Sequence, residues 1–411
     1  MLDIKFIREH KDLVIENCKK RNTECDVEGL LAIDEERREL QGSVDNLRAQ
    51  RKSQSKGKPS EEDIARLRKM GDEIAVLEAK AAEIEQKYKE ALMRIPNLTH
   101  PSTPIGGEED FVTVATHGNP PQFSFAPKDH EQILTELNMV DFERGAKVAT
   151  SKFYFAKNNL VRLNLALLNY GIDILSAHGF ELVETPDVAK NEILSGIGFN
   201  PRGAETQVYS IENTDLSLIG TAEITMGGYH ANEILDLQSG PKKYAAISHC
   251  FRTEAGAYGK TSKGMYRVHQ FTKLEMFIFC KPEDSEAMHQ ELLAMEREIV
   301  DGLEIPYRVI DVASGDLGGP AYRKFDIEAW MTMKNDYGEI TSTSNCTDYQ
   351  SRRLNIKYKK EDGTNEFVHT LNGTAVVLSR FPIALIENLQ QEDGSIRIPK
   401  ALQKYLNISH L

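Results

Sequence analysis

Apolar residues recur every three or four positions over much of the first hundred residues, a spacing that places them on one face of a helix. In the segment Glu61–Arg94 the spacing alternates between three and four without a break. The apolar positions are Leu67, Met70, Ile74, Leu77, Ala81, Ile84, Tyr88 and Ala91. Residues 27–47 carry a second apolar seam, and a polar break over residues 53–60 separates the two. Heptads of this kind build coiled coils, so the pattern predicts an antiparallel helical hairpin over about residues 27–95, roughly 50 Å long at 1.5 Å per residue.

The pattern changes after Pro96, which ends the second helix of the hairpin. The residues that follow are rich in proline, glycine and threonine, a composition typical of a linker. We therefore expect an N-terminal domain over residues 1–100, with a small helical cap over residues 1–25. A linker over residues 101–125 and a second domain over residues 126–411 complete the predicted organisation.

In the second domain, segments with helical periodicity alternate with short strand-like runs. Helices are predicted over residues 129–137, 160–177 and 282–303. Strands are predicted over residues 151–155, 244–251, 274–280, 326–330 and 339–345. Residues 369–388 have the pattern of a strand, a glycine turn and a helix with Arg380 near its start. An arginine at the positive end of a helix is favourable only where an anion also lies there, so this position predicts a phosphate site.

The strands predicted over residues 244–251 and 274–280 enclose a loop rich in glycine, lysine and arginine. Two antiparallel strands with such a loop form a platform on which a polyanion can lie. Arg252 and Glu254 alternate at the end of the first strand, where a side-chain period of two places them on one face. An ion pair at a sheet edge is the alternative interpretation of these two residues. Glu275 interrupts the second apolar strand, and a buried carboxylate needs a cationic partner, for which a ligand ammonium group is a candidate.

The charge of the chain is unevenly distributed. The 411 residues, enough for about two or three domains, carry a formal net charge of −13. This charge argues against non-specific nucleic-acid binding by the whole protein. Five cations with no acid among them nevertheless gather near the hairpin tip: Arg48, Arg51, Lys52, Lys56 and Lys58. A solvated tip is one interpretation, but a basic end on a long rigid arm favours contacts with a phosphate backbone.

The five cysteines are scattered, with no pair at zinc-ligand spacing. This arrangement predicts free thiols in a reducing cytoplasm. The N-terminus is charged from its third residue and predicts no secretory signal, and no apolar run is predicted to span a bilayer. We therefore expect a cytoplasmic protein without a membrane partner.

Short motifs follow one another along the second domain. They are Thr221-Ala-Glu, Phe251-Arg-Thr-Glu-Ala-Gly, Val268-His-Gln-Phe, Lys273-Leu-Glu-Met, Glu339-Ile-Thr-Ser and Leu371-Asn-Gly-Thr with Arg380 downstream. In this order, behind a basic coiled-coil arm, they resemble the bacterial-type seryl-tRNA synthetases over essentially the whole chain. The resemblance implies the α+β fold of a class II aminoacyl-tRNA synthetase, with an antiparallel sheet flanked by helices and an N-terminal antiparallel helical arm.

The resemblance also implies the reaction: ATP activates L-serine to seryl-adenylate, and the seryl group passes to the 3′ end of tRNA(Ser). Arg252 is implied to bridge the α-phosphate and the serine carboxylate, Glu254 to accept from the adenine amino group, and Arg380 to reach the γ-phosphate. Phe271 is implied to stack on the adenine. The implied ATP site comprises Arg252, Thr253, Glu254, Val268, His269, Gln270, Phe271, Glu339, Ile340, Thr341, Ser342 and Arg380. The implied serine pocket comprises Thr221, Ala222, Glu223, Arg252, Glu275 and Thr374. Glu339 and Ser342 are implied ligands of Mg²⁺, a hard cation that prefers oxygen.

The implied partners are tRNA(Ser), bound through its long variable arm by the basic hairpin tip, and a second copy of the chain. The segment Gly179–Pro186 resembles the family's dimer-interface motif. Transfer of serine to tRNA(Sec) stays open.

The chain departs from the common family pattern at Asn372-Gly-Thr-Ala-Val-Val-Leu-Ser-Arg380, where many relatives have a serine in place of Thr374 and a glycine in place of Ala375. Thr374 keeps a hydroxyl, although the selectivity of the pocket can be altered. Two other functions are open. A related enzyme could load serine onto a carrier protein, although such relatives tend to lose the arm. A non-enzymatic RNA-binding protein would be expected to lose Arg252, Glu339 or Arg380.

Overall fold

The structure, a computed structural model, describes residues 1–411 apart from residues 56–59, 200–206 and 255–263. The chain divides into two compact units, residues 1–98 and residues 99–411. Lys56 and Lys58, two of the cations assigned to the hairpin tip, lie outside the described residues.

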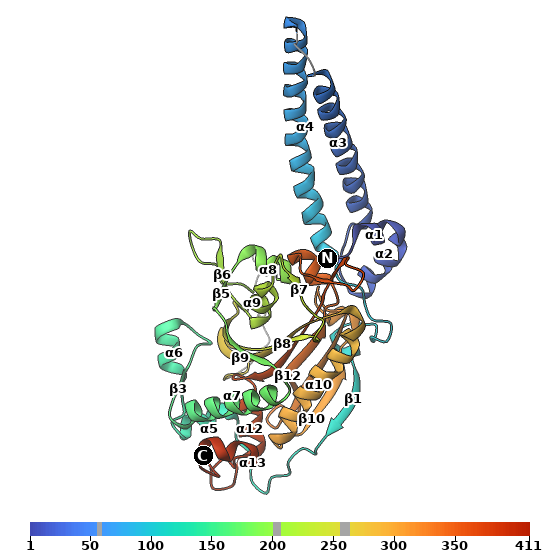
Figure 1. Ribbon diagram of the computed structural model, residues 1–411. Coiled ribbons are helices and arrows are strands. Elements are labelled where there is room, and N and C mark those ends of the chain that lie inside the picture. Colours follow the sequence, from blue (N-terminus) through green and yellow to red (C-terminus); the bar gives the residue numbers. More distant parts are fainter. Residues whose placement is uncertain (56–59, 200–206, 255–263) are drawn as a thin grey trace. The chain divides into compact units, whose positions relative to one another are not determined.

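The first unit consists of helices. Two short helices, α1 (Ile4–Glu9) and α2 (Lys11–Lys20), precede the long helices α3 (Val27–Gln54) and α4 (Glu61–Arg94). The long helices lie side by side (Figure 1). The predicted coiled-coil hairpin is thereby confirmed, and α4, with 34 residues, is about 50 Å long.

Local sequence accounts for the ends of the long helices. The Asp26 side chain accepts from the backbone N–H of Gly29 and caps α3. Ser60 and Asp63 form a reciprocal capping box at the start of α4. Helix α3 continues to Gln54, past the predicted end at residue 47, because the residues in between include no proline or glycine.

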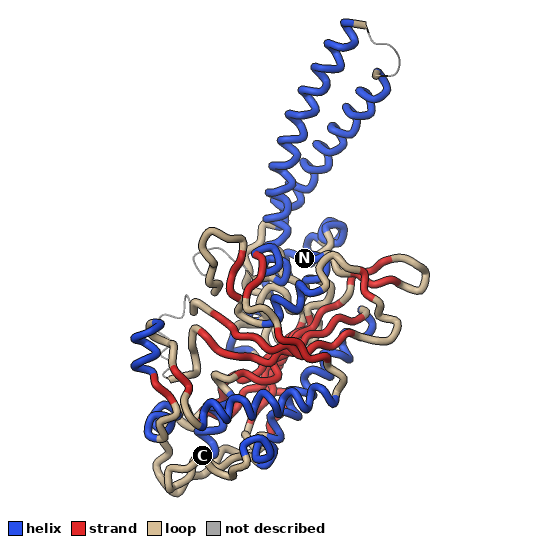
Figure 2. Tube along the Cα trace, turned by 60° about the vertical axis from the view of Figure 1, so that its left-hand side comes forward, coloured by secondary structure: helices blue, strands red, loops and turns tan. Residues whose placement is uncertain are grey.

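The second unit is built on a β-sheet with helices beside it (Figure 2). This sheet has eight strands in the order β1-β10-β11-β12-β15-β9-β8-β4. Neighbouring strands are antiparallel except for the parallel pair β4 and β8. In that order the strands are Val112–His117, Tyr307–Asp311, Arg323–Met331, Asp336–Asn345, His369–Val377, Gln270–Cys280, Lys242–Phe251 and Glu181–Glu184. The predicted α+β fold with an antiparallel sheet is confirmed.

Helices cover both faces of this sheet. One face packs mainly on α7 (Asn159–Ala177) and α10 (Ser285–Gly302), whose apolar residues share a cluster with Met276 and Ile278 of β9. The alternate residues Phe277 and Phe279 belong to a second cluster with α9 (Ala222–Tyr229). Since successive side chains of a strand point to opposite faces, α9 lies on the face opposite α7 and α10. Lys273 and Glu275 of β9 fall on the α9 face.

Shorter elements complete the unit. The remaining α-helices among the described residues are α5 (His130–Glu136), α6 (Phe142–Ala149), α8 (Asn191–Ile197), α11 (Tyr349–Leu354), α12 (Phe381–Leu389) and α13 (Lys400–Leu406). The small strands are β2 (Val140–Asp141), β3 (Phe155–Ala156), β5 (Val188–Lys190), β6 (Leu216–Leu218), β7 (Ile234–Leu235), β13 (Lys357–Lys359) and β14 (Asn365–Phe367).

Helix α7 is long and apolar enough, by length and composition, to be a candidate membrane span among the described residues. Its two charged side chains have partners on or near α13. Arg162 donates to the backbone oxygen of Leu406, and Asp173 accepts from Lys404. These contacts, with the packing of α7 on the sheet, make it a helix of the second unit.

Three predictions for the second unit need correction. The segment predicted as a linker, residues 101–125, contains β1, which pairs with β10 at one edge of the sheet. Gly373, predicted to lie in a turn, lies inside β15. A Cβ atom at this position would lie 3.0 Å from Oε1 of Glu296 on α10, so close packing accounts for the glycine. The strand predicted over residues 151–155 is in fact a turn followed by β3.

Candidate active site

The predicted serine-pocket residues meet on the α9 face of the sheet. Thr374 of β15 lies directly opposite Glu275 in the register of β15 and β9. Thr221 is the N-cap of α9, where its hydroxyl accepts from the backbone N–H of Glu223, and its side chain opposes the rise in the pKa of the neighbouring Glu275. Ala222 is fully buried beside it. The arrangement therefore combines two hydroxyls and two carboxylates around one position.

Glu223 is held by two amide side chains. Its Oε1 accepts from Nε2 of Gln350 at 2.7 Å and from Nδ2 of Asn372 at 3.0 Å. Burial, together with the nearby carboxyl group of Glu275, raises the pKa of Glu223 to about 7. A cation that binds beside the Glu223 carboxyl group would therefore favour its ionised form.

Glu275 has a protein partner that the sequence interpretation did not identify. Its carboxylate forms a buried ion pair with Lys273, two residues earlier on the same face of β9. The prediction that Glu275 needs a cation is correct, but in this structure Lys273 supplies the charge. Burial raises the pKa of Glu275, and the ammonium group of Lys273 opposes this shift.

Arg252 follows directly after β8. Its Nε donates to the backbone oxygen of Gly220 at 3.2 Å, and its guanidinium lies 5.3 Å from the centre of the Phe271 ring. Within the described residues, no carboxylate forms an ion pair with Arg252. Its charge nevertheless opposes the rise in the pKa of Glu223 and Glu275 and helps to lower the pKa of Glu339, so the guanidinium lies near these three carboxyl groups.

Glu254 does not lie in the strand, contrary to the prediction that it alternates with Arg252 on one face. Strand β8 ends at Phe251, and Glu254 adopts a left-handed backbone conformation with φ of 51°. Its Oε2 accepts from Nη1 of Arg267 at 2.6 Å. The alternative interpretation, an ion pair at a sheet edge, therefore holds only for Glu254, whose partner is Arg267, and not for Arg252.

The segment that returns from the basic loop runs alongside these residues. His269 accepts the backbone N–H of Arg252 on its carbonyl oxygen and contacts the Arg252 carbonyl through its ring. Val268 is buried, Gln270 is exposed and begins β9, and Phe271 is half-buried. Thr253 donates its N–H to the carbonyl of Gln207. The predicted adenine-site residues are therefore neighbours.

Glu339 and Arg380 contact each other directly. Nη1 of Arg380, the N-cap residue of α12, lies 2.9 Å from Oε1 and 2.9 Å from the backbone oxygen of Glu339. Burial raises the pKa of Glu339, but the positive charges of Arg380, Lys324 and Arg252 outweigh it and lower this pKa below its usual value. The carboxylate therefore stays ionised.

The neighbouring residues of β12 point in different directions. Ile340 is buried, at a point where the register of β11 and β12 shifts. The hydroxyl of Thr341 donates to Oε2 of Glu296 on α10 at 2.8 Å, so this side chain lies on the face opposite the site. Thr341 was expected to contact ATP, but its side chain points away from the site. Ser342 lies opposite Asp326 of β11, and its hydroxyl opposes the rise in the pKa of that carboxyl group.

Asp326 is a site residue that the sequence interpretation missed. Its side chain is nine-tenths buried on the face that carries Ser342, and its Oδ1 has no hydrogen-bond partner among the described residues. Burial raises the pKa of Asp326 to about 7, although Lys324 opposes the shift. An unpartnered buried carboxylate oxygen beside Glu339 and Ser342 fits a hard divalent cation.

The remaining missed residues, Gln350, Asn372 and Lys273, act as partners of predicted residues. Asn372 could have been found because it stands two positions before Thr374 and shares its face of β15. Lys273 could have been found in the same way from Glu275. Gln350 gives no local signal, since α11 reaches Glu223 only through the fold.

The cations near the hairpin tip differ in their partners. Arg48 donates from Nη2 to Oε1 of Glu78 on α4 at 2.7 Å. Arg51 and Lys52 form no ion pair with the described residues. The guanidinium of Arg51 lies close to Gly71, where an added Cβ atom would meet it at 3.3 Å. Arg51 and Lys52 are therefore the described tip cations with uncompensated charge.

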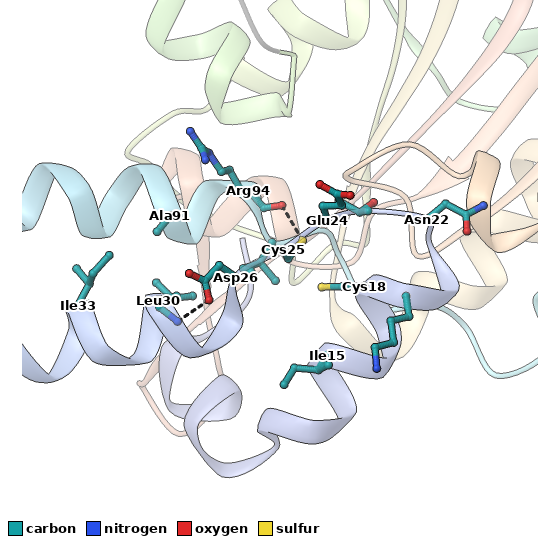
Figure 3. A pocket seen from close by; sticks show the side chains of 14 residues that line it. Ile15, Cys18, Asn22, Glu24, Cys25, Asp26, Leu30, Ile33, Ala91 and Arg94 are labelled. Atoms are coloured by element: carbon teal, nitrogen blue, oxygen red, sulfur yellow. Dashed lines mark hydrogen bonds between the residues drawn. The ribbon is translucent and has the colours of Figure 1, made fainter.

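The first unit also contains a hollow of about 1090 Å³ (Figure 3). It is lined by α2, the start of α3 and the end of α4, with Cys18 and Cys25 among the lining residues. The thiol of Cys25 lies 3.6 Å from the backbone oxygen of Arg94. None of the motif residues lines this hollow.

An antiparallel sheet that gathers an arginine at a strand end, a second arginine at a helix start and an acidic strand between them defines the core of a class II aminoacyl-tRNA synthetase. Residues 207–389 match the class II tRNA synthetase core domain family (G, H, P, S and T), and residues 1–99 match the seryl-tRNA synthetase N-terminal domain family. The chain belongs to the serine–tRNA ligase family, whose members are ATP-dependent ligases.

Curated relatives and solved structures agree over the full length. The chain is 52% identical to a serine–tRNA ligase of Treponema denticola, with 100% of both chains covered. It is 48% identical to the Rubrobacter xylanophilus serine–tRNA ligase, covering 99% of this chain and 98% of the relative. A seryl-tRNA synthetase from Pyrococcus horikoshii complexed with ATP superposes with a TM-score of 0.91 at 38% identity, covering 100% and 99% of the two chains. A cytoplasmic serine–tRNA ligase from Naegleria fowleri in complex with AMP gives a TM-score of 0.86 at 32% identity, covering 100% and 98%.

Proposed function

We propose that the site around Arg252, Glu275 and Thr374 activates L-serine with ATP and that the chain then transfers the seryl group to tRNA(Ser). The observation that carries this proposal is a guanidinium without a carboxylate partner among the described residues, placed next to a buried pair of carboxylates and a hydroxyl. Serine brings the complementary groups: a carboxylate, an ammonium group and a hydroxyl.

In this assignment Arg252 holds two anions together. Its planar guanidinium can bind the serine carboxylate and the α-phosphate at once, which brings the attacking oxygen to the phosphorus atom. The carboxylate then displaces pyrophosphate, and seryl-adenylate remains. Little covalent work is required of the protein, so positioning and charge neutralisation provide most of the rate enhancement.

Serine selectivity follows from the two carboxylates and the two hydroxyls. Glu223 and Glu275 receive the ammonium group and the serine hydroxyl, with Thr221 and Thr374 completing the hydrogen bonds. Alanine would leave these buried polar groups unpaired, and a larger side chain would meet Thr374. The threonine at position 374 keeps the hydroxyl of the common family serine while adding a methyl group.

The ATP molecule is assigned to the neighbouring residues. Phe271 offers a flat face for the adenine ring, Glu254 an acceptor for its amino group, and the segment Val268–Gln270 a backbone wall. Arg380 would bind the γ-phosphate at the start of α12. Arg267 and Arg380 are each paired with an acid, Glu254 and Glu339, so ATP binding would rearrange both ion pairs.

Glu339, Ser342 and Asp326 are the residues that would hold Mg²⁺. Mg²⁺ is usually bound through one or two carboxylates and the phosphates of the substrate, and three oxygen-bearing side chains on adjacent strands suit that pattern. When bound, the ion supplies charge neutralisation between the phosphates.

The hairpin arm is assigned to tRNA(Ser). Arg51 and Lys52 offer positive charge on a long rigid element, which suits recognition of a long variable arm by its backbone shape. Transfer to tRNA can be tested by charging purified tRNA(Ser), with tRNA(Sec) and a carrier protein assayed in parallel. Charging of tRNA(Ser) is the expected result, whereas seryl transfer to a carrier protein alone would support the alternative function.

A homodimer is the proposed assembly, in the cytoplasm. Strand β4 stands at an edge of the sheet, and Leu182 on it and Val161 and Leu165 on α7 are 48%, 41% and 56% exposed. Exposed apolar residues on adjacent elements suit a second copy of the chain. Cys18, Cys25, Cys250 and Cys280 are free thiols, which suits a reducing compartment. Sedimentation equilibrium should give a dimer, and Leu165→Glu should give a monomer.

A further inference from the structure

A buried histidine and a buried glutamate join three segments that are far apart in the sequence. His130, the first residue of α5, lies with Nδ1 2.7 Å from Oε1 of Glu387 on α12. Their side chains are 9% and 4% exposed. Neither residue belongs to the predicted site, and within the described part of the chain neither forms a hydrogen bond with a side chain assigned to serine.

The second nitrogen of the His130 ring meets the segment that returns from the basic loop. The backbone N–H of Met265 donates to Nε2 of His130 at 3.3 Å. Because an N–H group can only donate, Nε2 must be the acceptor, so Nδ1 carries the proton and donates to Glu387. The two contacts together fix the ring and its tautomer.

The other oxygen of Glu387 holds the turn between β11 and β12. Its Oε2 accepts from the backbone N–H of Met333 at 3.1 Å. Next to this contact, Asn388 donates to the backbone oxygen of Trp330 at 2.7 Å. Helix α12, which begins just after Arg380, is thus tied at its far end to the strands that carry Glu339 and Asp326.

The backbone beside Met265 leaves no room for a side chain. Gly264 has φ of +65°, and a Cβ atom there would lie 2.2 Å from Nε2 of His130. The imidazole ring therefore packs directly on the polypeptide backbone at this position. Such close contact fixes the backbone of residues 264–265, not merely a neighbouring side chain.

The two residues after Met265 contact two groups assigned to ATP, Arg380 and Glu254. Two cations lie over the Tyr266 ring. The guanidinium of Arg380 is 5.0 Å from the ring centre, and the ammonium group of Lys334 is 3.8 Å from the same point. Arg267 binds Glu254. A shift at Met265 would therefore move Tyr266 and Arg267 against Arg380, and a displacement of about 1 Å can cost a large factor in rate.

We propose that His130 and Glu387 are positioning residues, which set the place of residues 264–267 relative to Arg380 and so the affinity for ATP. His130 acts through the Met265 backbone and Glu387 through both His130 and Met333. The proposal rests on the assignment of Glu254 and Arg380 to ATP under the proposed function.

Two substitutions separate the two contacts of the ring. Asparagine places an amide nitrogen near the position of Nδ1, so His130→Asn keeps a donor to Glu387 and loses the acceptor for Met265. Glutamine reaches the position of Nε2, so His130→Gln keeps an acceptor for Met265. The matched control is His230→Asn, since His230 also meets a glutamate through Nδ1, at 2.7 Å from Glu233, and a second group through Nε2, at 2.9 Å from Tyr244.

The experiment measures ATP–pyrophosphate exchange with serine, recording the KM for ATP, the KM for serine and kcat for each variant, beside a thermal melt. We expect His130→Asn to raise the KM for ATP about tenfold with the KM for serine within about twofold, and His130→Gln to recover most of the loss. His230→Asn should change neither KM.

A similar rise of both KM values, an unchanged KM for ATP, or no recovery in His130→Gln would overturn the proposal. If His130→Asn does not fold, the same comparison is made with Glu387→Gln and His130→Gln. Absence of serine-dependent exchange in the unmodified protein would instead contradict the proposed function.

Discussion

Arg380 binds both the carboxylate and the backbone oxygen of Glu339 through a single guanidinium nitrogen, at 2.9 Å in each case. The two residues are assigned to the γ-phosphate and to Mg²⁺ respectively. Without substrate they neutralise each other, so ATP must compete with a protein carboxylate for the guanidinium. The guanidinium of Arg380 is therefore already paired with the Glu339 carboxylate before ATP binds.

Replacing Arg380 removes the cation assigned to the γ-phosphate. Arg380→Ala should lower serine-dependent ATP–pyrophosphate exchange by about 10² to 10³, the range found when one oriented charge or donor is lost. Arg323→Ala is the control, because Arg323 is a half-buried sheet arginine paired with Asp311 and outside the assigned site. Equal losses in the two variants would show that Arg380 acts only through the fold.

Thr374 is predicted to contribute its hydroxyl to serine binding. Thr374→Val keeps the shape and removes the hydroxyl, which should raise the KM for serine about tenfold and leave the KM for ATP within about twofold. Thr374→Ser should behave as the unmodified protein does or bind serine more tightly. Steady-state exchange at varied serine concentration measures this, and an unchanged KM for serine in Thr374→Val would remove Thr374 from the pocket.

The raised pKa of Glu223 predicts a pH dependence of stability. Burial and the carboxyl group of Glu275 raise this pKa from the usual 4.5 to about 7. Between these two values the folded protein holds a proton that the unfolded chain has released, so raising the pH through this range destabilises the fold, and the effect levels off above pH 7. The side chain of Glu223→Gln cannot titrate. Between about pH 5 and pH 7.5, the unfolding free energy of this variant should therefore fall by up to about 2 kcal/mol less than that of the unmodified protein.

Urea denaturation of the two proteins at both pH values measures that difference. Glu275, Glu296 and Asp326 also have raised pKa values through burial and add slopes of the same sign, so the comparison with Glu223→Gln isolates one group. Identical pH slopes in the two proteins would show that Glu223 titrates normally in the folded state.

The arm is predicted to act on tRNA alone. Replacing Arg51 and Lys52 together with alanine should weaken tRNA(Ser) charging, and should reduce the slope of log affinity against log salt by about 0.7 to 0.9 for each lost contact. ATP–pyrophosphate exchange should not change. Arg48→Ala serves as the comparison, since Arg48 is already paired with Glu78 and should have the smaller effect. A parallel loss of exchange would argue against a role confined to tRNA.

The sequence predicted the parts of the fold that depend on local pattern. The heptads of α4 gave its bounds, Glu61–Arg94, because the coiled-coil period and the Ser60 cap are both local. The turn predicted at Gly373 was wrong because local sequence does not show distant contacts. This glycine makes room for Glu296, which approaches from a helix far away in the sequence.

The missing site residues depended on strand register and long-range contacts. Asp326 lies opposite Ser342 only because β11 pairs with β12 in one register, which the sequence does not state. Lys273 could have been predicted as the partner of Glu275, because residues two positions apart on a strand share a face. The ion pair of Glu254 with Arg267 required knowing where the basic loop returns, and Gln350 reaches Glu223 from α11.

The most direct test of the central assignment is ATP–pyrophosphate exchange with serine, glycine, alanine, threonine and cysteine, for the unmodified protein and for Arg252→Ala. The account predicts exchange that depends on serine, is weak with the other four amino acids, and falls by about 10² or more in Arg252→Ala. Serine-dependent exchange that survives intact in Arg252→Ala would contradict the role given to this guanidinium. No exchange with any of the five, in folded protein with Mg²⁺ present, would contradict the account of the site as a whole.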